Sequence, residues 1–196
     1  MAIRKIAQLG EPVLRRPASP VPPEAIRSER VQSLIEDMIE TMRDADGAGI
    51  AAPQVYESLR LCVIEVNANP RYPSFPRIPL LVLVNPIVEV VSPADAPAAT
   101  LSMYEGCLSV TGIRGKVTRP RRVRVRALDR NGNPLAFEWE GIPAVIVQHE
   151  TDHLEGVLFV DRADPKTLTF LREYERHVPH EQRIVDAGVS SSASSG

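Results

Sequence analysis

Two histidines and a glutamate within residues 148–153 have the types and the spacing of a hydrolytic metal site. His149 and His153 are four residues apart, so on an α-helix they lie on one face, about one turn apart. Two imidazoles placed in this way can hold one divalent metal ion, and Glu150 is close enough to handle a proton for a bound water. A catalytic zinc-type site usually takes three protein ligands and leaves one position open. The pattern therefore requires a third ligand from elsewhere in the chain.

The residues around this motif predict the helix that it needs. Residues 141–143 open the helix, because Pro143 is tolerated in a first helical turn, and Gly156 is a natural C-terminal stop. The stretch between them is largely apolar. We therefore expect this helix to be central and to carry its metal ligands inside the fold.

Two further helices are predicted from capping residues and periodicity. Ser28 is a good N-cap, and apolar residues recur at helical spacing from Val31 to Met42, which predicts a helix over 28–45. Asp164 followed by Pro165 predicts the start of another helix over 165–177. The first is expected to cover the core from outside and the second to close one end.

Apolar and β-branched runs predict strands between these helices. Arg122, Arg124 and Arg126 alternate with apolar residues, which indicates a strand with one solvated face, and the pair at 131–132 predicts a hairpin turn after it. A break is expected at 85–86, an Asn-Pro pair. The predicted strands are 61–66, 80–84, 87–91, 122–127, 135–139 and 158–160, with a loop over 92–100. We expect an α+β fold, a single domain of antiparallel strands packed around the central metal-binding helix.

The composition argues against several function classes. A net charge of −2 gives no electrostatic case for nucleic acid or an anionic membrane, so the arginine-rich stretch 119–126 is interpreted as a solvated strand face. Two widely spaced cysteines indicate a reducing compartment. The first residues lack a signal-peptide pattern, and no apolar run approaches the roughly 18 residues that a membrane span requires. We expect a cytoplasmic protein with no nucleic-acid substrate and no membrane partner.

The third metal ligand has several candidates. A metzincin protease would have a histidine at the position of Phe159, so that interpretation loses its ligand. Glu173 or Glu175 could complete a thermolysin-like site, although a polar helix surface explains them more simply. Cys107, within 105–109, is a better candidate, and a buried structural cysteine is the alternative for it. Cys62 lies in an apolar run and is interpreted as structural.

Three segments in order resemble the peptide deformylase family, over roughly residues 1–170. They are Gly47-Ala48-Gly49-Ile50-Ala51-Ala52-Pro53-Gln54, Glu105-Gly106-Cys107-Leu108-Ser109 and Gln148-His149-Glu150-Thr151-Asp152-His153. The resemblance implies that Cys107, His149 and His153 hold one divalent metal ion, Fe²⁺ in the cell, with Zn²⁺ or Ni²⁺ as alternatives. We expect a catalytic domain of this type over 1–178 and a tail over 179–196, whose Ser/Ala/Gly-rich end predicts partial disorder.

The resemblance also implies a reaction, which is removal of the formyl group from N-terminal formylmethionine of new polypeptides, with release of formate. Glu150 would shuttle the proton, and the Gln54 side chain and the Leu108 backbone N–H would stabilise the oxyanion. Gly47 and Gly49 would bind the main chain of an extended substrate, with Arg114 nearby. The expected partners are nascent formyl-Met peptides and, transiently, the ribosome.

Two departures from the family pattern concern the substrate cleft. Ala48 stands where many members carry a larger aliphatic residue, and residues 110–112 lack a proline that is common there. Both affect the expected subsite preference and leave the ligands and the general base in place. Two alternatives remain, a different HExxH metallopeptidase and a non-catalytic protein of this type that only binds peptides.

Overall fold

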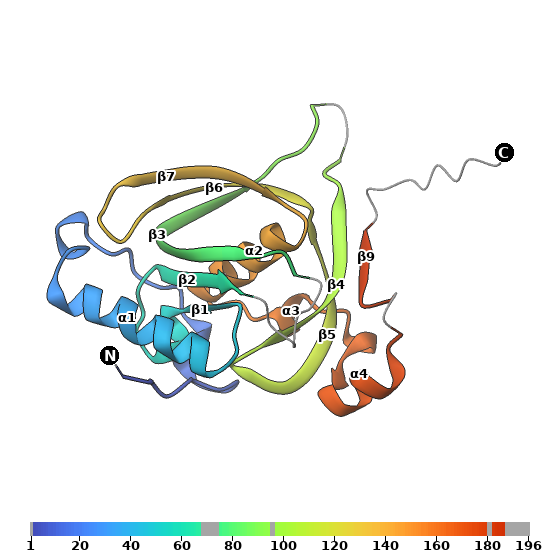
Figure 1. Ribbon diagram of the computed structural model, residues 1–196. Helices are drawn as coiled ribbons and strands as arrows, with labels where there is room; N and C mark the ends of the chain where they lie inside the picture. The colour runs from blue at the N-terminus through green and yellow to red at the C-terminus, as the bar shows by residue number, and fades with distance from the viewer. Residues whose placement is uncertain (1, 68–74, 95–96, 180–181, 187–196) are drawn as a thin grey trace.

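Two antiparallel sheets contact helix α2 (Ile142–Leu154), which carries both histidines (Figure 1). The computed structural model describes residues 2–67, 75–94, 97–179 and 182–186. The α+β class and the antiparallel pairing are therefore confirmed. Of the tail predicted from residue 179, residues 180–181 and 187–196 lie outside the described part of the chain.

The larger sheet has the strand order β1-β2-β3-β6-β7, with antiparallel pairing throughout. Its second strand is buried on both faces. Leu61 and Val63 pack in the cluster that contains helix α1, whereas Cys62 and Ile64 pack in the cluster that contains α2. This two-sided burial explains why the strand reads as a continuous apolar run. The strands are β1 (Gly49–Ala51), β2 (Leu61–Val66), β3 (Ile78–Val90), β6 (Arg122–Leu128) and β7 (Pro134–Glu140).

The break predicted at 85–86 is wrong, because β3 continues through it. The register with β6 shifts between Val84 and Ile87, and Asn85 has a φ of 52°. The Asn85 side chain bonds the backbone N–H and C=O of Val21, both at 2.9 Å. These residues form a bulge that ties the strand to the N-terminal segment.

The smaller sheet has the order β8-β5-β4-β9 and was largely missed by the sequence analysis. Its main strands are β4 (Thr100–Cys107) and β5 (Val110–Pro120), flanked by β8 (Thr169–Phe170) and β9 (Ile184–Asp186). Three glycines interrupt the apolar pattern between 106 and 115, so this stretch has weak strand propensity and depends on its pairing partners. The hairpin of β4 and β5 places Cys107 at its turn.

The helix predictions are partly confirmed. Helix α1 (Glu29–Asp44) begins after Ser28, whose side chain accepts a hydrogen bond from the Val31 N–H at 3.3 Å. Helix α2 has the predicted extent. The predicted helix over 165–177 is shorter, because 165–167 form a 3₁₀ turn and only α4 (Leu171–His177) is α-helical.

The strand predicted at 158–160 is wrong, because α3 (Phe159–Arg162) begins there. The Asp161 carboxylate accepts a hydrogen bond from the Leu158 N–H at 2.8 Å, which satisfies a free donor at the start of this short helix. Phe159 and Leu158 are fully buried, so the apolar run that resembled a strand packs as a helical turn.

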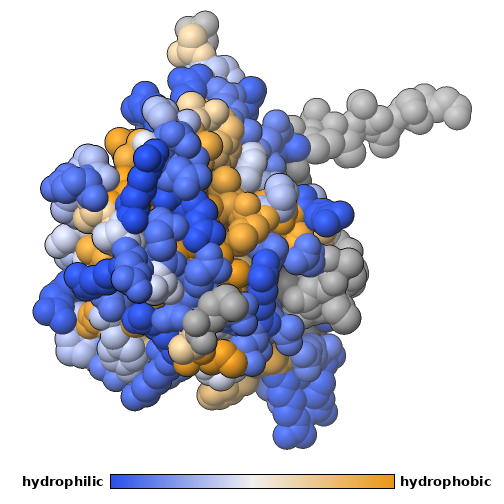
Figure 2. All heavy atoms as spheres, turned by 60° about the vertical axis from the view of Figure 1, so that its left-hand side comes forward, coloured by the Kyte–Doolittle hydropathy of each residue, from blue (hydrophilic) through white to orange (hydrophobic). Residues whose placement is uncertain are grey.

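The arginine-rich surface of β6 is solvated, as predicted. Arg122 and Arg124 are about half exposed and pair with Glu138 on β7. Arg126 pairs in the same way with Glu89 on β3. The face shown in Figure 2 is mostly hydrophilic, with apolar side chains exposed in patches between charged ones. Among the helices of the described residues, none combines the length and apolar character that a membrane crossing needs.

Candidate metal centre and active site

Cys107, His149 and His153 converge on one point, although they come from two elements. Their ligand atoms all lie within 4.8 Å of one another, and the Cys107 Sγ is 3.3 Å from the His153 Nε2. Cys107 ends β4, and the two histidines face it from one side of α2. A thiolate and two imidazoles at this separation fit one divalent ion of the zinc or iron type.

The two histidines have different surroundings. The Nδ1 of His149 lies 2.8 Å from the Glu105 Oε2, so its Nε2 is left for the cluster. Carboxylate contacts of this kind orient a metal-binding imidazole and make it more basic. His153 is 1% exposed, and burial lowers its pKa well below the ordinary value. The neutral imidazole that a metal ligand requires is therefore favoured at His153.

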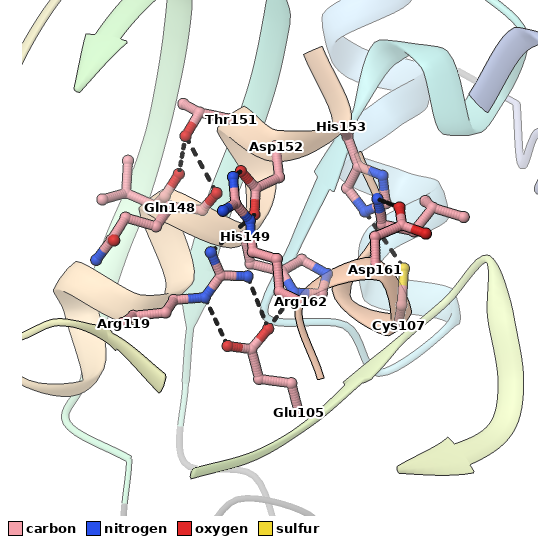
Figure 3. A network of polar contacts seen from close by, with 12 residues as sticks. Glu105, Cys107, Arg119, Gln148, His149, Thr151, Asp152, His153, Asp161 and Arg162 are labelled. Carbon is pink, nitrogen blue, oxygen red and sulfur yellow. Dashed lines mark hydrogen bonds and ion pairs between the residues drawn. The ribbon is translucent and has the colours of Figure 1, made fainter. Parts of the chain in front are cut away.

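A chain of charged side chains, buried except at Arg162, supports His149 through its Nδ1 (Figure 3). Arg119 donates to both oxygens of Glu105, at 2.6 and 3.0 Å, and to Asp152 at 2.7 Å. Arg162 also donates to both oxygens of Asp152. Burial opposes ionisation of Glu105, but hydrogen bonds from His149 and Arg119 outweigh it and lower the Glu105 pKa to about 2. Glu105 therefore stays charged and holds the His149 ring in place.

The prediction that Arg119 lies in the solvated face is wrong. Arg119 is 3% exposed and lies on β5, whereas the solvated arginines lie on β6. One signal was present. Pro120 separates Arg119 from the alternating series. Arg119 is also out of phase with the even-numbered Arg122, Arg124 and Arg126, so it does not share their face of a strand.

Replacing Arg119 with methionine is expected to destabilise the fold by about 3–5 kcal/mol, because it leaves Glu105 and Asp152 as buried charges without their shared cation. Urea unfolding of the metal-free protein measures this loss. Arg122→Met is the matched control, since Arg122 is half exposed and its ion pair is worth at most about 1 kcal/mol. Equal losses in the two variants would show that the buried network is not important for stability.

Glu150 lies beside the ligand cluster and is 4% exposed. Its Oε2 has no hydrogen-bond partner among the described residues. Burial raises the Glu150 pKa to about 7. A buried carboxylate of this kind is suited to accept a proton and to return it near neutral pH.

Gly49 provides the space that Glu150 occupies. A Cβ atom at Gly49 would lie 2.5 Å from the Glu150 Oε1 and 2.6 Å from its carboxyl carbon. Any larger residue at this position must displace the carboxylate. Gly49 therefore positions Glu150, in addition to the substrate-binding role that the sequence analysis gave it.

Gly49→Ala is expected to lower kcat by about 100-fold or more and to leave metal binding unchanged, because it moves Glu150 without touching a ligand. Gly47→Ala is the matched control. A Cβ at Gly47 meets the flexible end of Leu108 at 3.0 Å, so a smaller loss is expected there. Steady-state kinetics and metal analysis of both variants check this. A Gly49→Ala protein with normal kcat would show that the Glu150 position is not critical.

Gln54 is buried and has a fixed orientation. Its Oε1 accepts a hydrogen bond from the Ala51 N–H at 2.8 Å, and its Nε2 donates to the Ser109 Oγ at 3.1 Å. The same Nε2 is 3.5 Å from the Cys107 Sγ, so the amide donor end faces the ligand cluster. A cavity opens here, and its lining includes Gly47, Ala48, Gly49, Gln54, Met103, Gly106, Cys107, Leu108, Val145, Ile146, His149 and Glu150.

Arg114 lies behind this lining. It is 8% exposed, and its guanidinium covers the face of Gly106 where a side chain would be, 1.8 Å from an added Cβ. Gly106 is therefore required for Arg114 to pack at this position. The structure places Arg114 next to the cavity wall and outside the lining residues.

The rival ligand candidates lie elsewhere. Glu173 is on α4, 43% exposed, and contacts Arg176 and His177. Phe159, at the metzincin ligand position, stacks on the His149 ring with 6.3 Å between centroids. Cys62 is fully buried within β2, and burial raises its pKa well above the ordinary value.

A Cys/His₂ donor set beside a buried carboxylate, open to a cavity, defines the class of a metal-dependent hydrolase. Residues 3–168 match the model of the polypeptide deformylase family. The chain belongs to this family.

Individual relatives agree with this assignment. A peptide deformylase of Leptospira biflexa is 42% identical over 163 residues, which are 83% of this chain and 88% of the relative. A crystal structure of a class I type b peptide deformylase from Acinetobacter baumannii is 39% identical, with a TM-score of 0.77 over 84% of this chain and all of that chain. A Met-Ala-Ser-bound structure of the same enzyme is 40% identical, with a TM-score of 0.75 over 82% and 98% of the two chains.

Proposed function

We propose that this protein removes the formyl group from N-terminal formylmethionine of newly made polypeptides by hydrolysis, releasing formate. The observation that carries the proposal is the buried Glu150 carboxylate beside Cys107, His149 and His153, with Glu150, Cys107 and His149 lining one cavity. Family membership supports the same reaction. A water molecule adds to the formyl carbon, the carbon–nitrogen bond breaks, and the products are formate and a free amine.

Cys107, His149 and His153 would hold one divalent ion, which is Fe²⁺ in the cell in this proposal, with Zn²⁺ or Ni²⁺ as substitutes. When bound, the ion supplies Lewis acidity that makes hydroxide available near neutral pH. Glu150 takes the proton of the attacking water and delivers it to the leaving nitrogen. Its burial keeps bulk water away from this transfer.

Gln54 and the backbone N–H of Leu108 are proposed as donors to the oxygen on which negative charge develops. The Gln54 amide already has its orientation fixed by the Ala51 N–H and by Ser109, so little reorganisation is needed when the substrate binds. Removal of one such donor typically lowers the rate about 100- to 1,000-fold. Leu108 lies in the turn between β4 and β5, directly after the ligand Cys107.

The cavity is matched to a small acyl group followed by an apolar side chain. Gly47 and Gly49 line one wall and leave the backbone free to bind the substrate main chain. Met103, Val145 and Ile146 also line the cavity and form an apolar surface for the methionine side chain. Ala48 leaves more room at this wall than a larger aliphatic residue would.

The proposed partners are nascent formylated peptides. The protein would bind them as they leave the ribosome, during a transient contact with the ribosome. This setting places the protein in the cytoplasm, where bacterial-type translation supplies formylmethionine. Arg114 is proposed to act on the substrate indirectly, because its guanidinium supports Gly106 in the cavity wall.

The test uses iron-loaded protein that is prepared without oxygen, since a ligand thiolate is prone to oxidation. Formate release is measured from formyl-Met-Ala-Ser, with acetyl-Met-Ala-Ser and an unformylated peptide as controls. Release from the formylated peptide alone is the expected result. Cleavage of the unformylated peptide would favour an ordinary metallopeptidase, and binding without turnover would favour a peptide-binding protein.

A further inference from the structure

One edge of β4 is paired with β9 over part of its length and continues towards the catalytic cavity. Strand β9 covers this edge by antiparallel pairing from Leu101 to Met103. The Tyr104 N–H extends the ladder by donating to the Arg183 C=O at 3.0 Å. Figure 1 shows β9 running beside β4. The edge is therefore occupied up to Tyr104.

Two residues further along β4, Gly106 lies in the wall of the catalytic cavity. Glu105 and Cys107 both pair with β5, because the register shift between them places its extra residues on β5. Backbone groups of successive residues in a strand point to opposite edges, so those of Gly106 point to the same edge as those of Tyr104. Cys107 follows at once and belongs to the metal cluster. An extended peptide that adds to β4 beside the cluster must therefore pair at Gly106, in line with β9.

The direction of such a peptide is determined by its formyl end. That end must lie at the cluster, near Cys107, so the following residues run past Gly106 towards Tyr104. This direction is antiparallel to β4, as β9 is. At roughly 3.4 Å per residue, the chain reaches the beginning of β9 after about three residues.

We propose that β9 is a built-in stop, which limits strand pairing of the substrate to about its first three residues and turns the rest of the chain away from the sheet. This inference rests on the proposed function. The protein would then recognise only the N-terminal residues of a peptide, and kcat/KM would be independent of peptide length beyond the third residue. Deeper pairing would hold a product peptide more tightly and slow its release.

Arg183, the residue directly before β9, is anchored, as a stop requires. The Arg183 guanidinium stacks over the Tyr174 ring, with 4.7 Å to the centroid, and its Nε donates to the Val178 C=O at 3.3 Å. Tyr174 in turn contacts Tyr104, with ring centroids 5.2 Å apart. Arg183 thus fixes β9 to α4 and to the strand whose edge it closes.

The test compares formyl-Met-Ala-Ser with formyl-Met-Ala-Ser-Ala-Ala-Ala on three iron-loaded proteins, the full chain and truncations that lack 187–196 or 183–196. The first truncation keeps β9 and is the matched control. For it and for the full chain, we expect the same kcat/KM on both peptides. Loss of 183–196 opens the edge, and kcat/KM for the longer peptide should rise roughly 5-fold or more, because each new backbone hydrogen bond contributes a factor of about 2–10.

Two results would overturn the stop. One is a rise of kcat/KM with length in the full chain, and the other is equal behaviour of the two truncations. If the protein that lacks 183–196 does not fold, the peptide-length series on the full chain still shows whether kcat/KM reaches a plateau or continues to rise.

Amide hydrogen exchange separates this inference from the proposed function, because it needs no turnover. With the product peptide Met-Ala-Ser bound, Gly106 should gain protection in the full chain, whereas Tyr104 is protected already without peptide. Loss of protection at the β9 amides on binding of the longer product peptide would show that β9 is displaced and would overturn the stop. Absence of formate release from the tripeptide would instead overturn the proposed function.

Discussion

Glu150→Gln is expected to lower kcat about 100- to 10,000-fold while the protein keeps its metal ion, because the amide cannot take a proton from water or return it to the leaving nitrogen. Glutamine has nearly the size of glutamate, so it fits the space that Gly49 leaves. Formate release under single-turnover conditions measures the chemical step directly. Metal analysis of the same sample shows that the ligands are intact.

The matched control is Glu155→Gln, one residue past the end of the same helix. Glu155 is 54% exposed and pairs with Arg60, away from the ligand cluster. Its loss should leave kcat unchanged. A Glu150→Gln protein that deformylates at a near-normal rate would require another proton carrier, and the mechanism proposed for Glu150 would be wrong.

Cys107→Ser is expected to lose the metal ion and, with it, the activity. The hydroxyl of serine is a far weaker ligand than a thiolate for a soft or borderline ion, and the two histidines alone cannot hold the site. Metal content after dialysis measures the loss. This variant also separates the proposal from an ordinary HExxH peptidase, which would take its third ligand downstream and would be indifferent to Cys107.

Cys62→Ala is the control for the loss of a thiol. Cys62 is fully buried in β2 and lies outside the donor set, so its replacement should cost some stability but leave the metal content at about one ion per chain. A Cys107→Ser protein that retains its metal as fully as Cys62→Ala would exclude Cys107 as a ligand.

Local spacing made much of the site predictable. His149, Glu150 and His153 lie within one helical turn and a half, so their relative placement follows from helix geometry alone. Ser28 and the apolar spacing behind it likewise defined α1. Cys107 was different, because no local pattern places residue 107 against residue 153. That contact depends on the β4–β5 hairpin, whose glycine-rich sequence has weak strand propensity.

Two roles required the three-dimensional structure. Gly49 was expected to bind the substrate backbone. Its close approach to Glu150 could not be predicted, because the two residues belong to different motifs that are about a hundred residues apart. Arg119 was assigned to a solvated face by its neighbours in sequence, whereas it neutralises two carboxylates behind the metal cluster. Both arise from packing between elements that are distant in the chain.

The most direct test of the metal site is X-ray absorption at the zinc edge of protein loaded with one equivalent of Zn²⁺. The proposed donor set predicts one sulfur at about 2.3 Å, two imidazole nitrogens at about 2.0–2.1 Å and one further light atom. Cys62→Ala, which lies outside the donor set, should keep the sulfur signal. A first shell of nitrogen and oxygen alone in the unmodified protein would contradict the assignment of Cys107 as the ligand that completes the His149–His153 pair.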